Sequence, residues 1–112
     1  KTSSTTVARM KVSDLRGQWT EHWAEGQRAC NDVGQIKVRG KRISISMSDC
    51  SDGETYRITQ TRFRDNTLKF KVHTPSTSSN IYYELKPANS NTLTGQGSNG
   101  EKQWAITWTR NQ

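Results

Sequence analysis

Few residues of this 112-residue chain have the types and spacing that enzymatic chemistry needs. His22 and His73 are its two histidines, and neither belongs to a His-Glu-x-x-His motif. The sequence also lacks a Gly-x-Ser-x-Gly motif and a phosphate-binding loop. We interpret His22 as a histidine on the outer face of a strand rather than as half of a catalytic dyad. The sequence therefore predicts a protein that is not an enzyme.

Carboxylates gather between Asp49 and Glu54, in the segment Asp-Cys-Ser-Asp-Gly-Glu. A calcium site needs six or more oxygen ligands in a set geometry, and the spacing of an EF-hand is absent here. A turn rich in Asp and Gly explains the segment better. Zinc needs about four ligands, whereas the chain offers two cysteines and two isolated histidines. We expect no metal and no cofactor.

The two cysteines, Cys30 and Cys50, favour one disulfide. An even, sparse count in a small and weakly hydrophobic domain is typical of a stabilising disulfide in an oxidising compartment. Two free thiols in a cytosolic protein are the alternative. The disulfide interpretation places the protein in the periplasm or outside the cell.

Basic residues outnumber acidic ones by 17 to 10, which gives a net charge of +7. Such an excess favours anionic partners. Alternation predicts that five cations lie on the polar faces of two hairpins: Lys37, Arg39, Arg42, Lys69 and Lys71. Arg57, Arg62 and Arg64 are expected nearby. We expect an anionic envelope component or an acidic protein to bind there. Nucleic acid is disfavoured, because it would need exposed aromatic side chains for stacking, and here the aromatic residues share the parity of the apolar face.

The elements that position these residues are predicted to be strands. Hydrophobic residues make up only 29% of the chain, and no run approaches the roughly 20 needed for a membrane-spanning helix. Period-two alternation recurs between turn signals, in segments 17–24, 33–39, 42–48, 54–62, 67–73, 80–86, 91–97 and 102–110. We expect an all-β, eight-stranded antiparallel up-and-down barrel over residues 14–112, with a sandwich as the alternative. Residues 1–13 are predicted to form a polar tail.

Two predicted hairpins indicate which residues of neighbouring strands lie opposite each other. Around Gly40 the predicted partners are Val38 with Ile43, Ile36 with Ile45, and Gly34 with Met47. This register leaves the two cysteines one residue out of alignment, an offset that a bulge near Asn31 could absorb. Around the turn at residues 65–66 the parity changes along the first strand, which predicts a bulge between Thr59 and Arg62.

The inner face of such a barrel receives apolar side chains from several strands: Ile45, Met47, Phe70, Tyr83, Trp104 and Ile106. An eight-stranded barrel is either filled by its own side chains or holds one small ligand. These residues are therefore our candidates for a lumen that binds a small apolar ligand.

Both ends of the chain resemble the calycins, the superfamily of lipocalins, avidins and small bacterial lipocalin-like barrels. The residues that carry the resemblance are Gly17 and Trp19 in a Gly-x-Trp motif at the first strand, and Arg110 near the end of the last strand. In calycins the Trp closes one end of the barrel and the Arg packs over its face. The resemblance implies a non-enzymatic, lipocalin-like binding module.

A narrower resemblance is to the bacterial metalloprotease inhibitors, which are periplasmic eight-stranded barrels of about this size with one disulfide. It rests on the segment Ser-Asp-Leu-Arg-Gly-Gln-Trp-Thr at residues 13–20 and on the spacing of Cys30 and Cys50. The chain departs from these inhibitors after Cys50. Their N-terminal segment enters the protease cleft, which gives residues 1–4 that role in the alternative function of protease inhibitor. Binding of a polyanion or nucleic acid is a third alternative.

Overall fold

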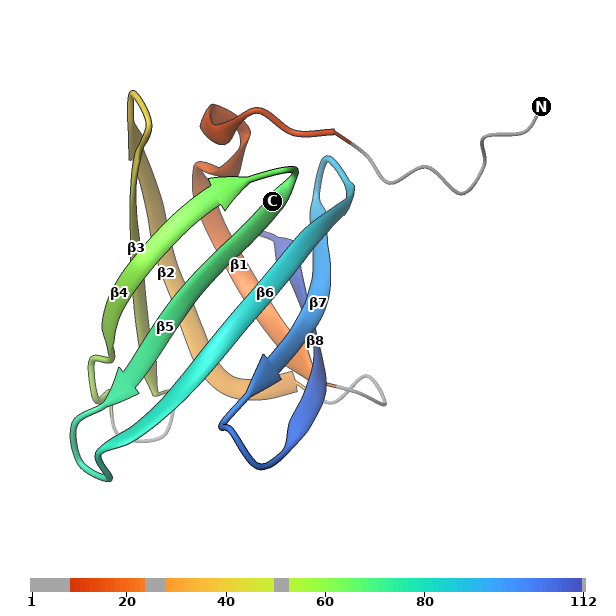
Figure 1. The fold of residues 1–112 in the computed structure, drawn as a ribbon. Coiled ribbons are helices and arrows are strands. Elements are labelled where there is room, and N and C mark those ends of the chain that lie inside the picture. Colours follow the sequence, from red (N-terminus) through yellow and green to blue (C-terminus); the bar gives the residue numbers. More distant parts are fainter. Residues whose placement is uncertain (1–8, 24–27, 50–52, 112) are drawn as a thin grey trace.

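The computed structural model describes residues 9–23, 28–49 and 53–111, with the backbone alone for residues 28–32 and 34. A short 3₁₀ helix precedes eight antiparallel strands (Figure 1). In chain order the elements are η1 (Val12–Leu15), β1 (Gly17–Trp23), β2 (Arg28–Arg39), β3 (Arg42–Asp49), β4 (Arg57–Arg64), β5 (Thr67–Thr74), β6 (Ser79–Asn89), β7 (Thr92–Ser98) and β8 (Gln103–Arg110).

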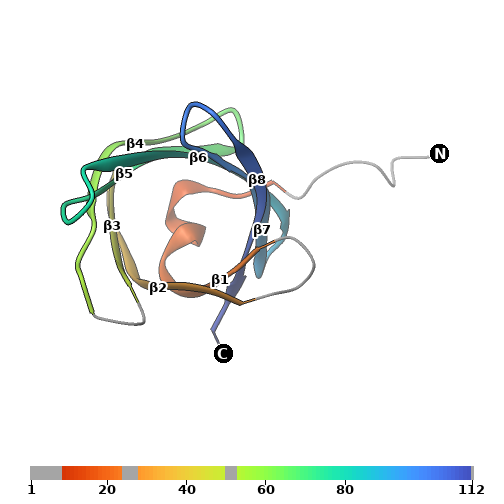
Figure 2. The same cartoon turned by 90° about the horizontal axis from the view of Figure 1, so that it is seen from below.

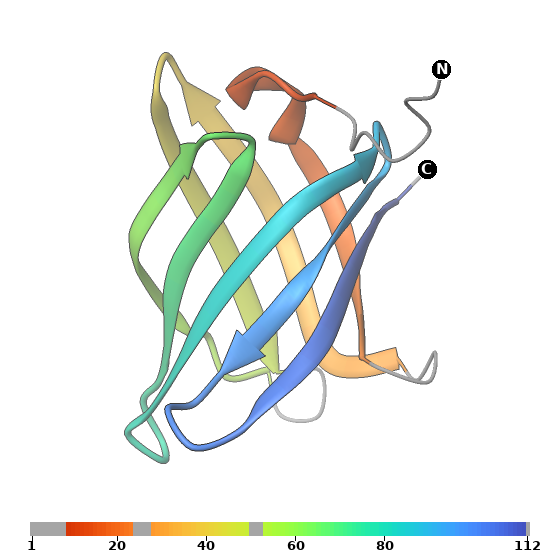
Figure 3. The ribbon, with the colours of Figure 1, turned by 45° about the vertical axis from the view of Figure 1, so that its right-hand side comes forward.

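The strands form one sheet in the order β3-β2-β1-β8-β7-β6-β5-β4, so β1 also pairs with β8. The sheet curls until its edge strands β3 and β4 approach each other (Figures 1 and 3). Within the described residues, a single bridge pair, Ser48 with Thr55, links the two sides. Nearby, the backbone N–H of Tyr56 donates to the carbonyl of Met47 (2.9 Å). The result is an all-β, nearly closed eight-stranded barrel, which is compatible with a calycin-like fold.

Alternation along the strands explains how so few apolar residues make a core. In β5, for example, Leu68, Phe70 and Val72 are buried, while Lys69 between them is exposed. The same pattern on the other strands gathers the buried apolar side chains into one cluster inside the barrel. A sheet with one solvated face needs apolar residues only at every second position, so 29% of the chain suffices.

One end of the barrel is closed by η1, which lies inside the ring of strands when the molecule is viewed along its axis (Figure 2). Leu15 at the end of η1 is fully buried, and its carbonyl accepts a hydrogen bond from the indole N–H of Trp19 (3.1 Å). The guanidinium of Arg110 lies over the Trp19 ring, 4.3 Å from its centroid. Gly17 has a φ of +127°, and a Cβ there would lie 3.0 Å from the Arg110 guanidinium. Glycine therefore suits both the backbone conformation and the close approach of the arginine.

The observed register confirms the bulge between Thr59 and Arg62 and the partners of Ile36 and Val38. The pairing of Gly34 with Met47 is wrong, because an irregularity between Val33 and Ile36 places Val33 opposite Met47 instead. Glycine has no side chain to mark a face, so alternation in this stretch does not fix the register.

Two strands extend three or more residues beyond one predicted end: β2 begins at Arg28, and β6 continues through Pro87 to Asn89. Pro87 fits in β6 because the described β5–β6 ladder ends at Leu85, so nothing pairs with Pro87 on that side. Met10 and Val12, which the sequence assigns to the tail, pack against the core.

Two predictions concern residues that the structure does not describe. Residues 1–8 and Cys50 are not described, and neither is the side chain of Cys30. The disulfide and the role of the N-terminal segment therefore stay predictions.

Candidate binding groove on the outer wall

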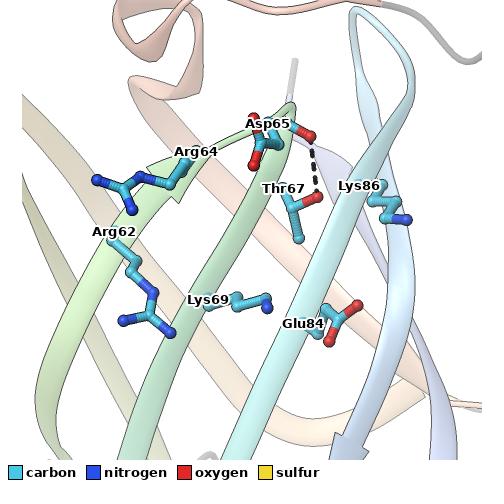
Figure 4. A pocket seen from close by; sticks show the side chains of 7 residues that line it. All are labelled: Arg62, Arg64, Asp65, Thr67, Lys69, Glu84 and Lys86. Atoms are coloured by element: carbon cyan, nitrogen blue, oxygen red, sulfur yellow. Dashed lines mark hydrogen bonds between the residues drawn. The ribbon is translucent and has the colours of Figure 1, made fainter.

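Charged side chains gather around a concavity on the outer face of β4, β5 and β6 (Figure 4). Its volume is about 430 Å³. Its lining, called the basic groove below, holds four cations, two carboxylates and one threonine: Arg62, Arg64, Lys69, Lys86, Asp65, Glu84 and Thr67. The cations come from β4, β5 and β6; in Figure 4 Lys69 extends toward Glu84, whereas Arg64 and Lys86 lie at opposite sides of the lining.

The β4 bulge determines which arginines reach the groove. Before it, Arg57 and Thr59 point outward; after it, Arg62 and Arg64 do. Without an inserted residue, strict alternation would turn Arg62 and Arg64 into the barrel. Gln60, in the bulge, has a φ of +58°. The bulge thus gives the groove two of its cations.

Cross-strand pairing brings the other charges into the same row. Lys69 on β5 lies opposite Arg62 on one side and Glu84 of β6 on the other. Lys86 follows Glu84 on the outer face of β6. Like charges directly opposite each other destabilise a sheet, so Arg62 beside Lys69 is unfavourable unless an anion lies between them.

The four cations keep their charges available to a ligand. The structure gives Arg62, Arg64, Lys69 and Lys86 no hydrogen bond or ion pair within the part of the chain it describes. All four are exposed. The hydrogen bond drawn in Figure 4 joins the Thr67 hydroxyl to the carbonyl of Asp65 (3.1 Å), which fixes the β4–β5 turn.

The groove extends across the outer face of β6 to β7. Two adjoining hollows share Glu84 and Gln96 with each other, and one of them reaches Tyr82. Tyr82 is 49% exposed, and the ammonium of Lys71 lies 5.9 Å from its ring centroid. An aromatic ring therefore borders the basic surface.

The predicted cationic residues are divided between two places. Lys69 lines the groove and Lys71 lies beside it, over Tyr82. Lys37, Arg39 and Arg42 are exposed on the β2–β3 hairpin, on the far side of the open edge between β3 and β4.

Sequence reasoning did not include Lys86 and Glu84 in the site. Alternation does indicate that both side chains point outward, because residues 82, 84 and 86 lie on the same face of one strand. The predicted strand ended at residue 86, next to a proline that we interpreted as the start of a turn.

The predicted lumen residues all lie on the inner face. Ile45, Met47, Phe70, Tyr83 and Ile106 are buried, and Trp104 is half-buried. Phe70 stacks on Tyr83 with ring centroids 4.7 Å apart, and Trp108 contacts Phe70 at 5.5 Å. The concave regions that we find around the described residues are lined mainly from the outer faces and the rims of the barrel. The lumen ligand stays a prediction.

Glu21 is a fully buried carboxylate on the inner face of β1. Its Oε1 accepts hydrogen bonds from the hydroxyl of Tyr83 (2.9 Å) and the indole N–H of Trp108 (3.0 Å). Its Oε2 accepts one from the indole N–H of Trp23 (2.9 Å). Sequence reasoning missed this residue, although its parity with Trp19 in the same strand indicates an inward position.

The remaining candidates make structural contacts. His22 Nε2 lies 3.2 Å from the hydroxyl of Thr109, and His73 Nδ1 lies 2.9 Å from Oδ1 of Asn80. Among the described residues, no three His, Cys, Asp or Glu side chains are grouped so that they could hold a metal ion. No described helix is long and apolar enough to cross a membrane.

Comparison with known proteins finds no match to this chain among protein families, curated proteins or solved structures.

Proposed function

We propose that this protein is a non-enzymatic binding module that holds an anionic partner in the basic groove. The observation that carries the proposal is that one hollow is lined by four cations: Arg62, Arg64, Lys69 and Lys86. None of the four forms an ion pair with a carboxylate of the described chain. Closely spaced cations of this kind repel one another, and an anion placed among them relieves the repulsion.

The outer wall is a better candidate than the lumen because of how each is filled. The inner face is occupied by packed aromatic rings and by Glu21, whose described donors are Tyr83, Trp108 and Trp23. An apolar ligand would have to displace these contacts and would bring apolar surface against a carboxylate. The groove is open to solvent, so a ligand can enter it without breaking packing contacts or hydrogen bonds of this kind.

We also propose that the chain is a calycin-like protein exported to the periplasm or beyond the cell. The supporting features are the meander of eight strands and the contact between Trp19 and Arg110 at the closed end. An exported protein of net charge +7 meets anionic envelope components and acidic proteins, and we propose these as its partners. The alternative role of protease inhibitor rests on residues 1–4, which lie outside the described residues.

Binding to polyglutamate and to vesicles that contain anionic phospholipid would test the groove. The double variant Arg62→Gln/Lys69→Gln removes two of the four groove cations. Each exposed charge contact contributes about 0.2–1 kcal/mol, so binding at low salt should weaken by about fivefold. It should also weaken with added salt, because ions screen exposed charges beyond roughly 8 Å at physiological ionic strength.

The matched control is Lys37→Gln/Arg39→Gln, which removes the same charge from the β2–β3 hairpin. This variant should bind as the unmodified protein does. Equal weakening by both variants would mean that net charge alone, and not the groove, attracts the partner. Binding that is independent of salt would contradict an electrostatic site altogether.

A further inference from the structure

The β5–β6 hairpin and the β7–β8 turn lie at the same end of the barrel (Figures 1 and 3). Residues of both line a hollow, called the notch below. The β5–β6 ladder continues down to Thr74 and Ser79, but the β6–β7 ladder stops at Tyr82 and Ser98. Residues 79–81 therefore pair with β5 on one side and with no strand of the described chain on the other. The hollow in this place has a volume of about 700 Å³.

Two aromatic residues line the notch. Tyr82 is 49% exposed, and Trp104, on the inner face of β8, is half-buried. Trp104 packs directly against Gly97, where an added Cβ would lie 3.3 Å from the indole ring. The same Cβ would lie 2.7 Å from Cδ1 of Ile106, so the glycine allows both inner-face side chains to pack closely here. The notch thus offers two ring surfaces at the mouth of the barrel.

Two amide side chains in the lining are oriented by hydrogen bonds at their oxygens. Oδ1 of Asn80 lies 2.9 Å from His73 Nδ1. Oδ1 of Asn99 accepts hydrogen bonds from the backbone N–H groups of Glu101 (2.9 Å) and Lys102 (2.8 Å). The side-chain NH₂ groups of both residues have no acceptor in the described chain, which leaves them as donors to a ligand.

The chemistry of this lining differs from that of the basic groove. It combines aromatic rings, two amide donors and the Glu101 carboxylate as acceptor, and it contains no lysine or arginine. An anionic ligand would be repelled by Glu101. A purely apolar ligand would bury the amides of Asn80 and Asn99 without hydrogen bonds, which is costly.

We propose that the notch binds a neutral oligosaccharide. The C–H faces of different sugar rings pack on Tyr82 and on Trp104, while hydroxyls accept from the amides of Asn80 and Asn99 and donate to Glu101. Sites of this kind combine apolar and aromatic surface with a few fixed polar groups. The ligand class and the residues are different from those of the anionic partner, so this site stands whether or not the basic groove binds an anion.

Titration with maltohexaose, cellohexaose and chitohexaose, followed by tryptophan fluorescence and by the indole N–H signals in NMR, would test the site. We expect at least one of the three to bind saturably at up to millimolar concentration and to shift the Trp104 signal. Asn80→Asp and Asn99→Asp keep the oxygen that holds each side chain in place but remove the donor. Each should weaken binding by about tenfold. Tyr82→Ala should do the same by removing a ring.

The matched control is Asn89→Asp at the end of β6, next to the β6–β7 turn at the opposite end of the barrel. There Oδ1 accepts from the backbone N–H of Asn91 (2.9 Å), an arrangement like that of Asn99. This variant adds the same charge and should bind unchanged. Lack of binding by all three oligosaccharides would overturn the proposal, as would affinities that the notch variants leave intact or that Asn89→Asp lowers equally. Far-UV circular dichroism of each variant verifies that it is folded.

Discussion

Replacement of Glu21 should reveal how much the barrel depends on one buried carboxylate. In Glu21→Ala the hydroxyl of Tyr83 and the indole N–H of Trp108 lose an acceptor that both now share. Tyr83 is 3% exposed and Trp108 is fully buried, so water cannot replace the carboxylate without a rearrangement of the core. Each buried donor left without an acceptor costs about 1–3 kcal/mol.

The two donors together predict a loss of about 4 kcal/mol in the free energy of unfolding. Trp23 contributes little to this loss of free energy, because it is 41% exposed and its indole N–H can donate to water instead. A loss of this size is a large fraction of the 5–15 kcal/mol that stabilises a typical domain. The measurement is urea unfolding followed by circular dichroism, with the slope of the transition compared between variants.

Glu21→Gln is the informative partner variant. Its amide oxygen can still accept from Tyr83 and Trp108, while its NH₂ faces the Trp23 donor. We expect a loss of about 1–2 kcal/mol, the cost of one hydrogen bond. Trp23→Phe, which removes only the exposed donor, should cost less than either. Equal losses for the Gln and Ala variants would refute the reasoning, because the charge rather than the hydrogen bonds would then dominate.

Two further predictions concern segments at the edge of the described chain. Asn31 and Asp49 form the last described pair of the β2–β3 ladder, and Cys30 and Cys50 are the next residues of the two strands in sequence. We therefore expect a disulfide between them. It should contribute about 3 kcal/mol to stability by closing a loop of roughly twenty residues. Mass spectrometry with and without reductant checks it, and two alkylatable thiols in the native protein would contradict it. The resemblance to the metalloprotease inhibitors predicts that deletion of residues 1–5 abolishes inhibition of an extracellular metalloprotease while the thermal unfolding of the barrel is unchanged. Inhibition that survives the deletion would count against that role.

The strand pattern could be predicted because the barrel has one apolar and one polar face. Alternation locates the strands and even the β4 bulge, since Ile58 and Phe63 have opposite parity and both face the core. It fails where side chains carry no facial signal, as at Gly34. It also fails at Pro87, because a proline fits in a strand at an unpaired edge or beside a bulge, and the end of the β5–β6 ladder at Leu85 depends on a strand that the local segment does not contain.

The candidate sites were harder to predict than the strands. Parity indicates that Lys69 and Lys86 are outward, but which outward cations meet depends on the register of three strands. The buried position of Glu21 could not be predicted for a different reason. Hydrophobicity assigns a carboxylate to the surface, whereas the aromatic residues that donate hydrogen bonds to Glu21 come from β1, β6 and β8. Such a cluster is created by closure of the barrel, and no local segment of the sequence contains it.

The outer face of β6 connects the two proposed sites. It carries Tyr82 at the notch, Glu84 in the middle and Lys86 in the groove. A strand rises about 3.3 Å per residue, so Tyr82 and Lys86 are separated by roughly 13 Å along β6. One partner that carries both sugar and anionic groups could therefore contact both sites, whereas two unrelated ligands would use them independently. Binding of one such partner to Arg62→Gln and to Asn99→Asp distinguishes these cases, because either change weakens a partner that contacts both sites, whereas a ligand of one site is weakened by only one of the two changes.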